Sequence, residues 1–111
     1  MQAITNSQTK AALFDDAGLL MDPRDWDEAL ARQIALREGV GDLTDAHWRI
    51  IYALRVHYAQ FAVAPPVSQV CVAQGMQKYC GHELFHTCLN AWKVAGLPDP
   101  GEEARTYLND M

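Results

Sequence analysis

The pattern His-Glu-x-x-His occupies residues 82–86 and is the densest group of chemically active side chains in the sequence. Histidines one helical turn apart can bind zinc, and a glutamate beside the first can activate water. Cys80 and Cys88 flank the pattern, so thiolates and imidazoles together could hold a metal without hydrolytic activity. No third ligand follows at the usual protease spacing. We therefore expect no metal or other cofactor, and we keep a metal site at His82 and His86 as an alternative.

Three cysteines offer thiol chemistry, in which the thiolate is the reactive form. An odd number of cysteines in a chain that can build a core argues against a disulfide framework, so we expect reduced thiols. Cys71 lies on the apolar side of a predicted helix and is expected to be a small buried residue. Cys80 and Cys88 are the candidate reactive thiols, and a bridge between these two is a further alternative.

The composition fits one small domain. The chain has 111 residues, of which 50% are apolar, and a formal net charge of −5. This charge gives no general affinity for nucleic acid or anionic lipid. The longest apolar runs are far shorter than the roughly 20 residues that cross a bilayer, and residues 1–10 do not resemble a secretory signal. We expect a soluble, cytoplasmic protein that makes no membrane contact.

Turn signals and apolar spacing divide the chain into a flexible N-terminus at residues 1–10, a helical domain at 11–94 and a C-terminal segment at 95–111. Within the domain, short apolar runs on both sides of Asp15-Asp16-Ala17-Gly18 predict a β-hairpin over residues 11–21.

Several helices are expected after this hairpin. Asp25 and Glu28 have the spacing of a capping box, which predicts a first helix over residues 26–38 that ends at glycine. Further helices are predicted over residues 67–79, ended by Gly81, and over residues 82–94, with a break near 86–87.

A longer helix is predicted between Thr44 and the proline pair at residues 65–66. The Thr44 hydroxyl can cap its first amides, and His47 is expected to contribute to its start. One face is expected to be broad, aromatic and buried, because these residues recur at steps of three and four: Trp48, Ile51, Tyr52, Arg55, Tyr58 and Phe61.

Three stretches, taken in order, resemble the DsrC/TusE family of sulfur-trafficking proteins. An Arg-x-x-Tyr element at Arg55 and Tyr58 and the proline pair lie between the second and the third. The stretches are Phe14-Asp-Asp-Ala-Gly-Leu-Leu-Met-Asp-Pro with Asp25-Trp26, Leu43-Thr-Asp-Ala-His-Trp48, and Ala95-Gly-Leu-Pro-Asp-Pro100.

This resemblance implies a mainly α fold, namely a small orthogonal helical bundle with an N-terminal β-hairpin and a mobile C-terminal arm that enters a partner's active site. It also implies protein partners of the sulfur relay or dissimilatory sulfite reductase type. In the family a cysteine near the end of the arm carries a persulfide, or a trisulfide bridge to a second cysteine upstream. An exposed thiolate on a tether suits this chemistry.

In this sequence both of those positions hold other residues. Alignment on the arm places Trp92 at the upstream cysteine position and Glu103 at the terminal one. Arg55 and Tyr58 are candidates for holding the arm against the bundle through charge-assisted and aromatic contacts. The arm itself is defined by Ala95, Gly96, Leu97, Pro98 and Pro100.

We therefore expect a protein that is not an enzyme and that regulates or docks on the family's protein partners. One alternative is a persulfide carrier that uses Cys80 or Cys88 as a relocated cysteine. A second alternative is a DNA-binding regulator, since Arg49, Arg55 and His57 give one helix a basic character, although the net acidity disfavours it. A metal-binding protein is the third.

Overall fold

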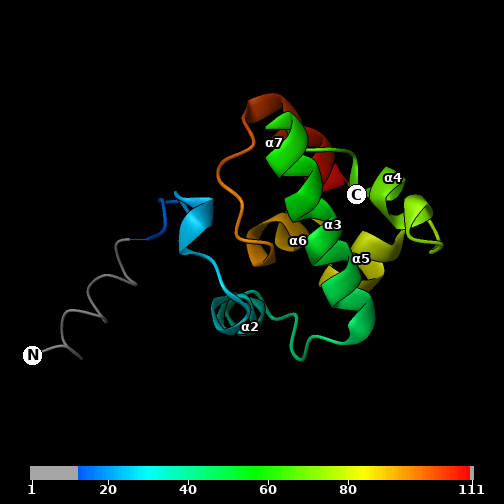
Figure 1. The fold of residues 1–111 in the computed structure, drawn as a ribbon, viewed down its shortest axis with the longest axis horizontal. Helices are drawn as coiled ribbons and strands as arrows, with labels where there is room; N and C mark the ends of the chain where they lie inside the picture. Colours follow the sequence, from blue (N-terminus) through cyan, green and yellow to red (C-terminus); the bar gives the residue numbers. More distant parts are fainter. Residues whose placement is uncertain (1–12, 111) are drawn as a thin grey trace, which may run out of the picture.

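The computed structural model describes residues 13–110, and it confirms the prediction of a mainly helical fold (Figure 1). The predicted flexible segment and the first two residues of the predicted hairpin lie outside the described residues. Within the described part of the chain, no helix is both long and apolar enough to span a membrane. The elements are the 3-10 helix η1 (Pro23–Asp25) and the helices α2 (Glu28–Arg37), α3 (Asp45–Phe61), α4 (Val67–Ala73), α5 (Cys80–Phe85), α6 (Cys88–Val94) and α7 (Glu102–Asp110).

A tight turn replaces the predicted β-hairpin, which is wrong for the described residues. One antiparallel bridge, between Phe14 and Leu20, is the only strand pairing that residues 13–110 contain. The Asp15 carboxylate accepts hydrogen bonds from the amides of Ala17 at 2.9 Å and Leu19 at 3.0 Å. Because an aspartate side chain can satisfy local amides in this way, it competes with the ladder of a hairpin.

Helix α2 begins at Glu28, two residues later than predicted. Asp27 is its N-cap, and the Asp27 carboxylate accepts a hydrogen bond from the Leu30 amide at 2.7 Å. The predicted capping role of Asp25 is wrong, because Asp25 belongs to η1 and Trp26 then takes an extended conformation. Gly39 follows the helix with a φ of 76°, a conformation that glycine adopts without strain.

His47 fixes the start of α3 and connects it to α5. The Thr44 amide donates to His47 Nδ1 at 3.0 Å, and His47 Nε2 lies 2.8 Å from the Leu84 carbonyl oxygen. Since Nδ1 accepts a hydrogen bond, the ring proton is on Nε2, which donates to Leu84. The predicted contribution of His47 to the helix start is confirmed, and both ring nitrogens of this buried side chain have partners.

The buried face of α3 is aliphatic, and the predicted aromatic face is wrong in part. Ile50, Ile51 and Leu54 are fully buried, whereas Tyr52 is 42% exposed and Phe61 is 59% exposed. Tyr52 lies off the aliphatic stripe and faces outward, whereas Phe61 is in phase with the stripe but is exposed at the last residue of the helix. The helix also stops before the proline pair, since Ala62 adopts a φ of 57° and its amide donates to the Tyr58 carbonyl.

Helices α4 and α5 differ from the predicted pattern. Helix α4 ends at Ala73, and Gly75 with a φ of 77° turns the chain back, so the predicted helix to Tyr79 is too long. Gly81 was expected to cap that helix but lies buried inside α5. A Cβ atom there would be 2.7 Å from Cys88 Sγ, so the lack of a side chain allows α5 to pack on α6. The predicted break near 86–87 is confirmed.

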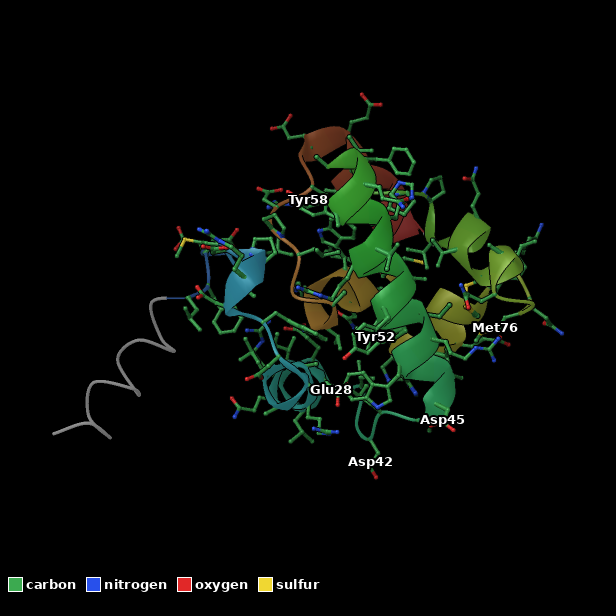
Figure 2. All side chains as sticks on the ribbon, viewed as in Figure 1. Glu28, Asp42, Asp45, Tyr52, Tyr58 and Met76 are labelled. Atoms are coloured by element: carbon green, nitrogen blue, oxygen red, sulfur yellow. A yellow bond between two sulfur atoms is a disulfide. The ribbon has the colours of Figure 1, made fainter. Side chains whose placement is uncertain are left out.

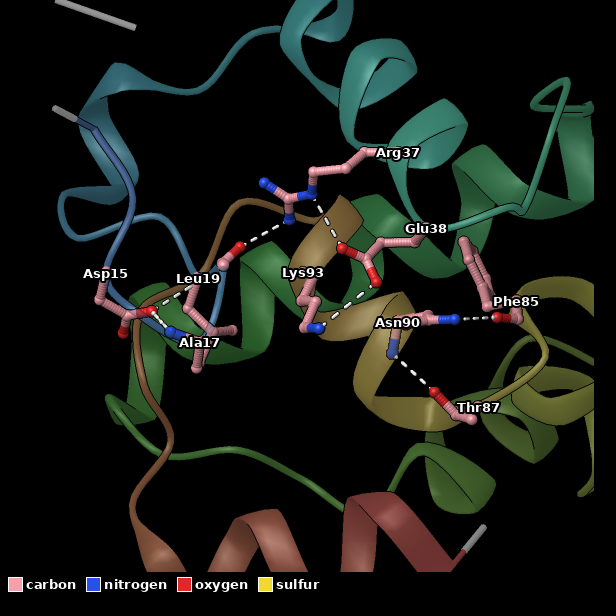
Figure 3. A network of polar contacts seen from close by, with 10 residues as sticks. Asp15, Ala17, Leu19, Arg37, Glu38, Phe85, Thr87, Asn90 and Lys93 are labelled. Atoms are coloured by element: carbon pink, nitrogen blue, oxygen red, sulfur yellow. Dashed lines mark hydrogen bonds and ion pairs between the residues drawn. The ribbon is translucent and has the colours of Figure 1, made fainter. Parts of the chain in front are cut away.

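Helix α6 is central to the bundle and packs against α2, α3, α5 and α7 (Figure 1). A short polar network holds the surrounding segments to it (Figure 3). Arg37 donates to the Gly18 carbonyl oxygen at 2.6 Å and to the Glu38 carboxylate at 2.8 Å. Lys93 on α6 completes the network at 3.4 Å from the second oxygen of Glu38. The N-terminal turn, α2 and α6 are thereby connected.

Trp26 joins the N-terminal half of the fold to the segment after α6. Its indole Nε1 donates to the Val94 carbonyl oxygen at 2.9 Å. Gly96 lies against the indole ring with a φ of 69°, and a Cβ atom there would overlap the ring. Glycine is therefore required at this position for two reasons, backbone conformation and space.

We predict that Gly96→Ala lowers the free energy of unfolding by about 3 kcal/mol, because it combines backbone strain with overpacking against Trp26. Gly39→Ala is the matched control, since Gly39 has a φ of 76° and nothing lies within 4 Å of a Cβ atom there. This control should lose only about 1 kcal/mol, the cost of strain alone. Urea unfolding of both variants measures the difference, and equal losses would show that the contact with Trp26 is not tight.

Candidate functional site

Arg55 on α3 lies where three segments of the chain meet. Its guanidinium donates to the Ala95 carbonyl oxygen at 2.7 Å and to the Pro23 carbonyl oxygen at 3.1 Å. Its central carbon also lies 4.1 Å from the ring centre of Trp26, which is a cation–π geometry. The sequence therefore brings η1, α3 and the segment after α6 together around one cation.

The environment of Arg55 is electrostatically unusual. Among the described side chains no carboxylate forms an ion pair with it, so carbonyl oxygens and an aromatic ring take the place of a counter-ion. Burial lowers the pKa of the guanidinium, an effect that Tyr52 partly offsets. A partly buried cation without a counter-ion is stable only when its hydrogen-bond donors have partners, so these contacts depend on one another.

Tyr58 and Trp92 form the next layer of the same site. Their rings are 5.8 Å apart and nearly perpendicular, which is a favourable edge-to-face arrangement. Figure 2 shows Tyr58 on the C-terminal half of α3. The fully buried Trp92 donates through Nε1 to the Pro98 carbonyl oxygen at 2.7 Å. Tyr58 is thus connected to the segment after α6 indirectly, because Trp92 contacts both Tyr58 and Pro98.

Residues 95–110 lie against the bundle in the structure. Ala95, Gly96 and Leu97 are buried, while Pro98 and Pro100 are half-buried. Helix α7 then packs on α6. The buried side chains of α7 that the structure describes are Ala104 and Leu108, and the segment before it is braced by a 2.9 Å ion pair between Asp99 and Arg105.

The two positions at which the resemblance expects cysteines differ in environment. Trp92 is in the core, and its indole N–H holds the segment after α6 through the Pro98 carbonyl oxygen. Glu103 is exposed in the first turn of α7, where a carboxylate interacts favourably with the helix dipole. Neither side chain offers a nucleophile for sulfur.

The cysteines are arranged differently from the prediction. Cys71 and Cys80 form a disulfide that joins α4 to α5, so the expectation of reduced thiols and the alternative bridge from Cys80 to Cys88 are both wrong. The early end of α4 explains the pairing, because the chain reverses after Ala73 and brings the two Cα atoms to 5.8 Å. Cys88 is free and buried, and burial raises its pKa to about 11.

The His-Glu-x-x-His pattern is not on one continuous helix. Helix α5 ends at Phe85, and His86 follows with a φ of 72°, its Nε2 lying 3.1 Å from the Gly39 carbonyl oxygen. His82 is exposed. In residues 13–110 no three or more His, Cys, Asp or Glu side chains are grouped so that they could hold a metal ion. The helical spacing that suggested two ligands on one face is therefore lost at the break.

Sequence reasoning missed the role of Trp26. We expected Trp26 to be the first residue of an amphipathic helix, whereas its ring contacts both Arg55 and Gly96. Its only sequence signal was its place in the Asp25-Trp26 pair of the family resemblance, which carries no information about its contacts.

Comparisons with known proteins agree with this fold. The structure matches the crystal structure of the oxidized gamma-subunit of the dissimilatory sulfite reductase (DsrC) from Archaeoglobus fulgidus with a TM-score of 0.70 and 31% identity. The match covers 80% of this chain and 89% of that one. The protein therefore has the helical fold of a sulfite reductase gamma-subunit.

Sequence matches define the family. A family model described as DsrC like protein matches residues 6–102. Sulfurtransferase TusE of Sodalis glossinidius (strain morsitans) is 38% identical over 95 residues, which cover 78% of this chain and 87% of that protein. A Sulfurtransferase TusE homolog of Haemophilus influenzae is 35% identical over 98 residues, with coverages of 79% and 88%. The chain belongs to the DsrC/TusE family of sulfur relay and sulfite reductase gamma-like proteins.

These relatives correct one prediction. We expected the protein not to be an enzyme, because the family's cysteine positions hold Trp92 and Glu103. Relatives that are 38% and 35% identical to this chain are named sulfurtransferases, which contradicts that expectation. The identity of two residues was too narrow a basis for excluding an activity.

We predict that Arg55→Met lowers the free energy of unfolding by about 2 kcal/mol, since it removes two hydrogen bonds and a cation–π contact but keeps the apolar stem. Tryptic cleavage after Arg105 should also be faster in the folded Arg55→Met variant than in the unmodified protein. Arg24→Met is the control, because the Arg24 side chain is 89% exposed, and it should change little. If the two variants behave alike in urea unfolding and in proteolysis, the Arg55 contacts do not hold residues 95–105.

We predict that Cys88 reacts with iodoacetamide at neutral pH at least about a hundredfold more slowly than an ordinary thiol, because its raised pKa and its burial leave little accessible thiolate. The folded pKa is about 11 against a reference value of 9.0, so the neutral thiol persists well above neutral pH. In urea the same cysteine should react at the ordinary rate. Intact mass spectrometry follows both reactions, and rapid labelling of the folded protein would contradict the prediction.

Proposed function

We propose that this protein takes part in sulfur transfer by docking on a partner protein of the sulfur relay or sulfite reductase type, with residues 95–110 held on its own bundle. The observation that carries the proposal is the hydrogen bond from the Arg55 guanidinium to the Ala95 carbonyl oxygen, at 2.7 Å. This bond holds the start of the segment against α3. The family resemblance implies that the corresponding segment of other members works as a mobile arm. Here it is proposed to act as part of a preformed docking surface.

The state of the thiols supports the docking proposal. Cys71 and Cys80 are joined, and Cys88 is buried with a pKa raised to about 11. A thiolate is needed for nucleophilic attack on sulfur, and none of the described cysteines presents one in this state. The proposal therefore places the reactive sulfur on the partner while the complex is formed.

A second candidate is a persulfide carrier that uses Cys80, and it is favoured by the sulfurtransferase names of the relatives. A dithiol would first reduce the Cys71–Cys80 disulfide. The Cys80 thiolate would then attack the outer sulfur of a donor persulfide, and the donor would leave as a thiolate. Attack of the Cys71 thiolate on Cys80 Sγ would release hydrosulfide and restore the disulfide.

Binding to purified partners tests the docking proposal. The native protein should bind a TusBCD-type relay complex or a dissimilatory sulfite reductase, and a Cys71→Ala/Cys80→Ala double variant that keeps its circular dichroism spectrum should bind equally well. Calorimetric titration measures both affinities. If the native protein bound neither the relay complex nor the sulfite reductase, the proposal would be overturned.

Loading with sulfur separates the two candidates. After incubation with a persulfide donor, the disulfide-bonded protein should show no added sulfur in its intact mass. The same experiment on protein whose Cys71–Cys80 disulfide has been reduced tests the second candidate. A carrier should gain the mass of one sulfur atom, and the Cys80→Ala variant should not. Sulfur on the native, unreduced protein would contradict the docking proposal.

A further inference from the structure

A groove of about 630 Å³ lies between α3 and α4 and adjoins the site around Arg55 at Tyr52. Tyr52 and Val56 line it from α3, and Val70 and Ala73 line it from α4. The two helices are in contact, and α4 lies to the right of α3 in Figure 1. The groove is thus formed by side chains of two packed helices.

The floor of the groove is apolar and open to solvent. Val56 is 56% exposed, and Tyr52 lies one helical turn before it on the same outer face of α3. Helix α3 therefore carries apolar residues on two faces. The face with Ile51 and Leu54 is buried in the core, and the face with Tyr52 and Val56 is exposed. Exposed apolar side chains that gather in a concave site are typical of surfaces that bind a helix or an extended segment of another protein.

One end of the groove carries a cation, Arg49. Arg49 donates to the Gln74 carbonyl oxygen at 2.6 Å, which holds its guanidinium across the end of the groove between α3 and α4. His57 lines the same groove further along α3. Ala73 also borders a neighbouring hollow that Lys78 lines. This local positive character contrasts with the formal net charge of −5 of the chain.

The acidic group beside the groove is already paired. The Tyr52 hydroxyl donates to Glu28 on α2, and Figure 2 labels both residues. Arg32 lies 3.7 Å from the same carboxylate and stacks over Trp48, with its central carbon 5.2 Å from the ring centre. The charge of Glu28 is thus compensated on α2, so it does not offset the charge of Arg49.

We propose that the α3–α4 groove binds an acidic amphipathic segment of a partner protein. This inference rests on the proposed docking function and adds a second contact surface to the one proposed for residues 95–110. The apolar floor would take the apolar face of the segment, while Arg49 would meet its carboxylates and the His57 ring would offer a hydrogen bond. A nucleic acid fits less well, because the floor of Tyr52, Val56 and Val70 is apolar and offers no positive charge to phosphates.

The test uses two fluorescent helical peptides, one built from Leu and Glu and one from Leu and Lys in the same order. In anisotropy titrations the Glu peptide should bind at least about tenfold more tightly than the Lys peptide, and added salt should weaken it. Val56→Glu should weaken binding of the Glu peptide by about tenfold or more, because it places a like charge in the groove. Equal binding of the two peptides would overturn the assignment.

Leu36→Glu is the matched control, since Leu36 is 70% exposed on α2 and does not line the groove. Both variants replace an exposed side chain, and their melting temperatures check the fold. Affinity for the Glu peptide should be unchanged in Leu36→Glu. Equal weakening by the two variants would show that the peptide responds to net charge and not to the groove.

The same variants separate this inference from the docking function. If a purified relay complex or sulfite reductase binds the native protein and Val56→Glu equally well, the docking function stands and the groove is not its surface. Binding of a DNA duplex that Val56→Glu abolishes, or self-association that Val56→Glu abolishes in sedimentation, would assign the groove to a different occupant and would also overturn the inference.

Discussion

The partly buried guanidinium of Arg55 is the constraint on which the fold of this protein depends. A charge removed from water is costly unless its donors have partners. Here the partners are the carbonyl oxygens of Pro23 and Ala95 and the face of Trp26, which come from distant parts of the chain. Each of these segments is therefore positioned by the same cation, and displacing one would leave donors of the guanidinium unpaired in the folded protein.

This arrangement bears directly on how a DsrC/TusE-family protein uses its C-terminal region. In this chain the region is buried at residues 95–97, and Trp92 holds it through the Pro98 carbonyl. The Cys71–Cys80 disulfide lies elsewhere, between α4 and α5. The C-terminal segment and the thiol chemistry are thus separate parts of the molecule, which is why we propose that docking and sulfur bonding are separable functions.

Local sequence signals predicted several features correctly, for reasons that are local. Thr44 and His47 define a helix start because they are close in sequence, and a helix break was evident near residues 86–87. The hairpin failed because the Asp15 side chain took the amides of the turn. Contacts between distant residues, such as Trp26 with Gly96, leave no periodic signal, so the centre of the site could be found only from the structure.

Hydrogen exchange of the native protein tests the central claim most directly. The amides of Ala95, Gly96 and Leu97 donate to carbonyls at the end of α6, and the amide of Arg105 in α7 donates to the carbonyl oxygen of Gly101, just before that helix. If Arg55 and Trp92 hold this region on the bundle, these amides should exchange as slowly as those of α6 itself. Exchange at the rate of an unstructured peptide over residues 95–108, while α6 stays protected, would contradict the account.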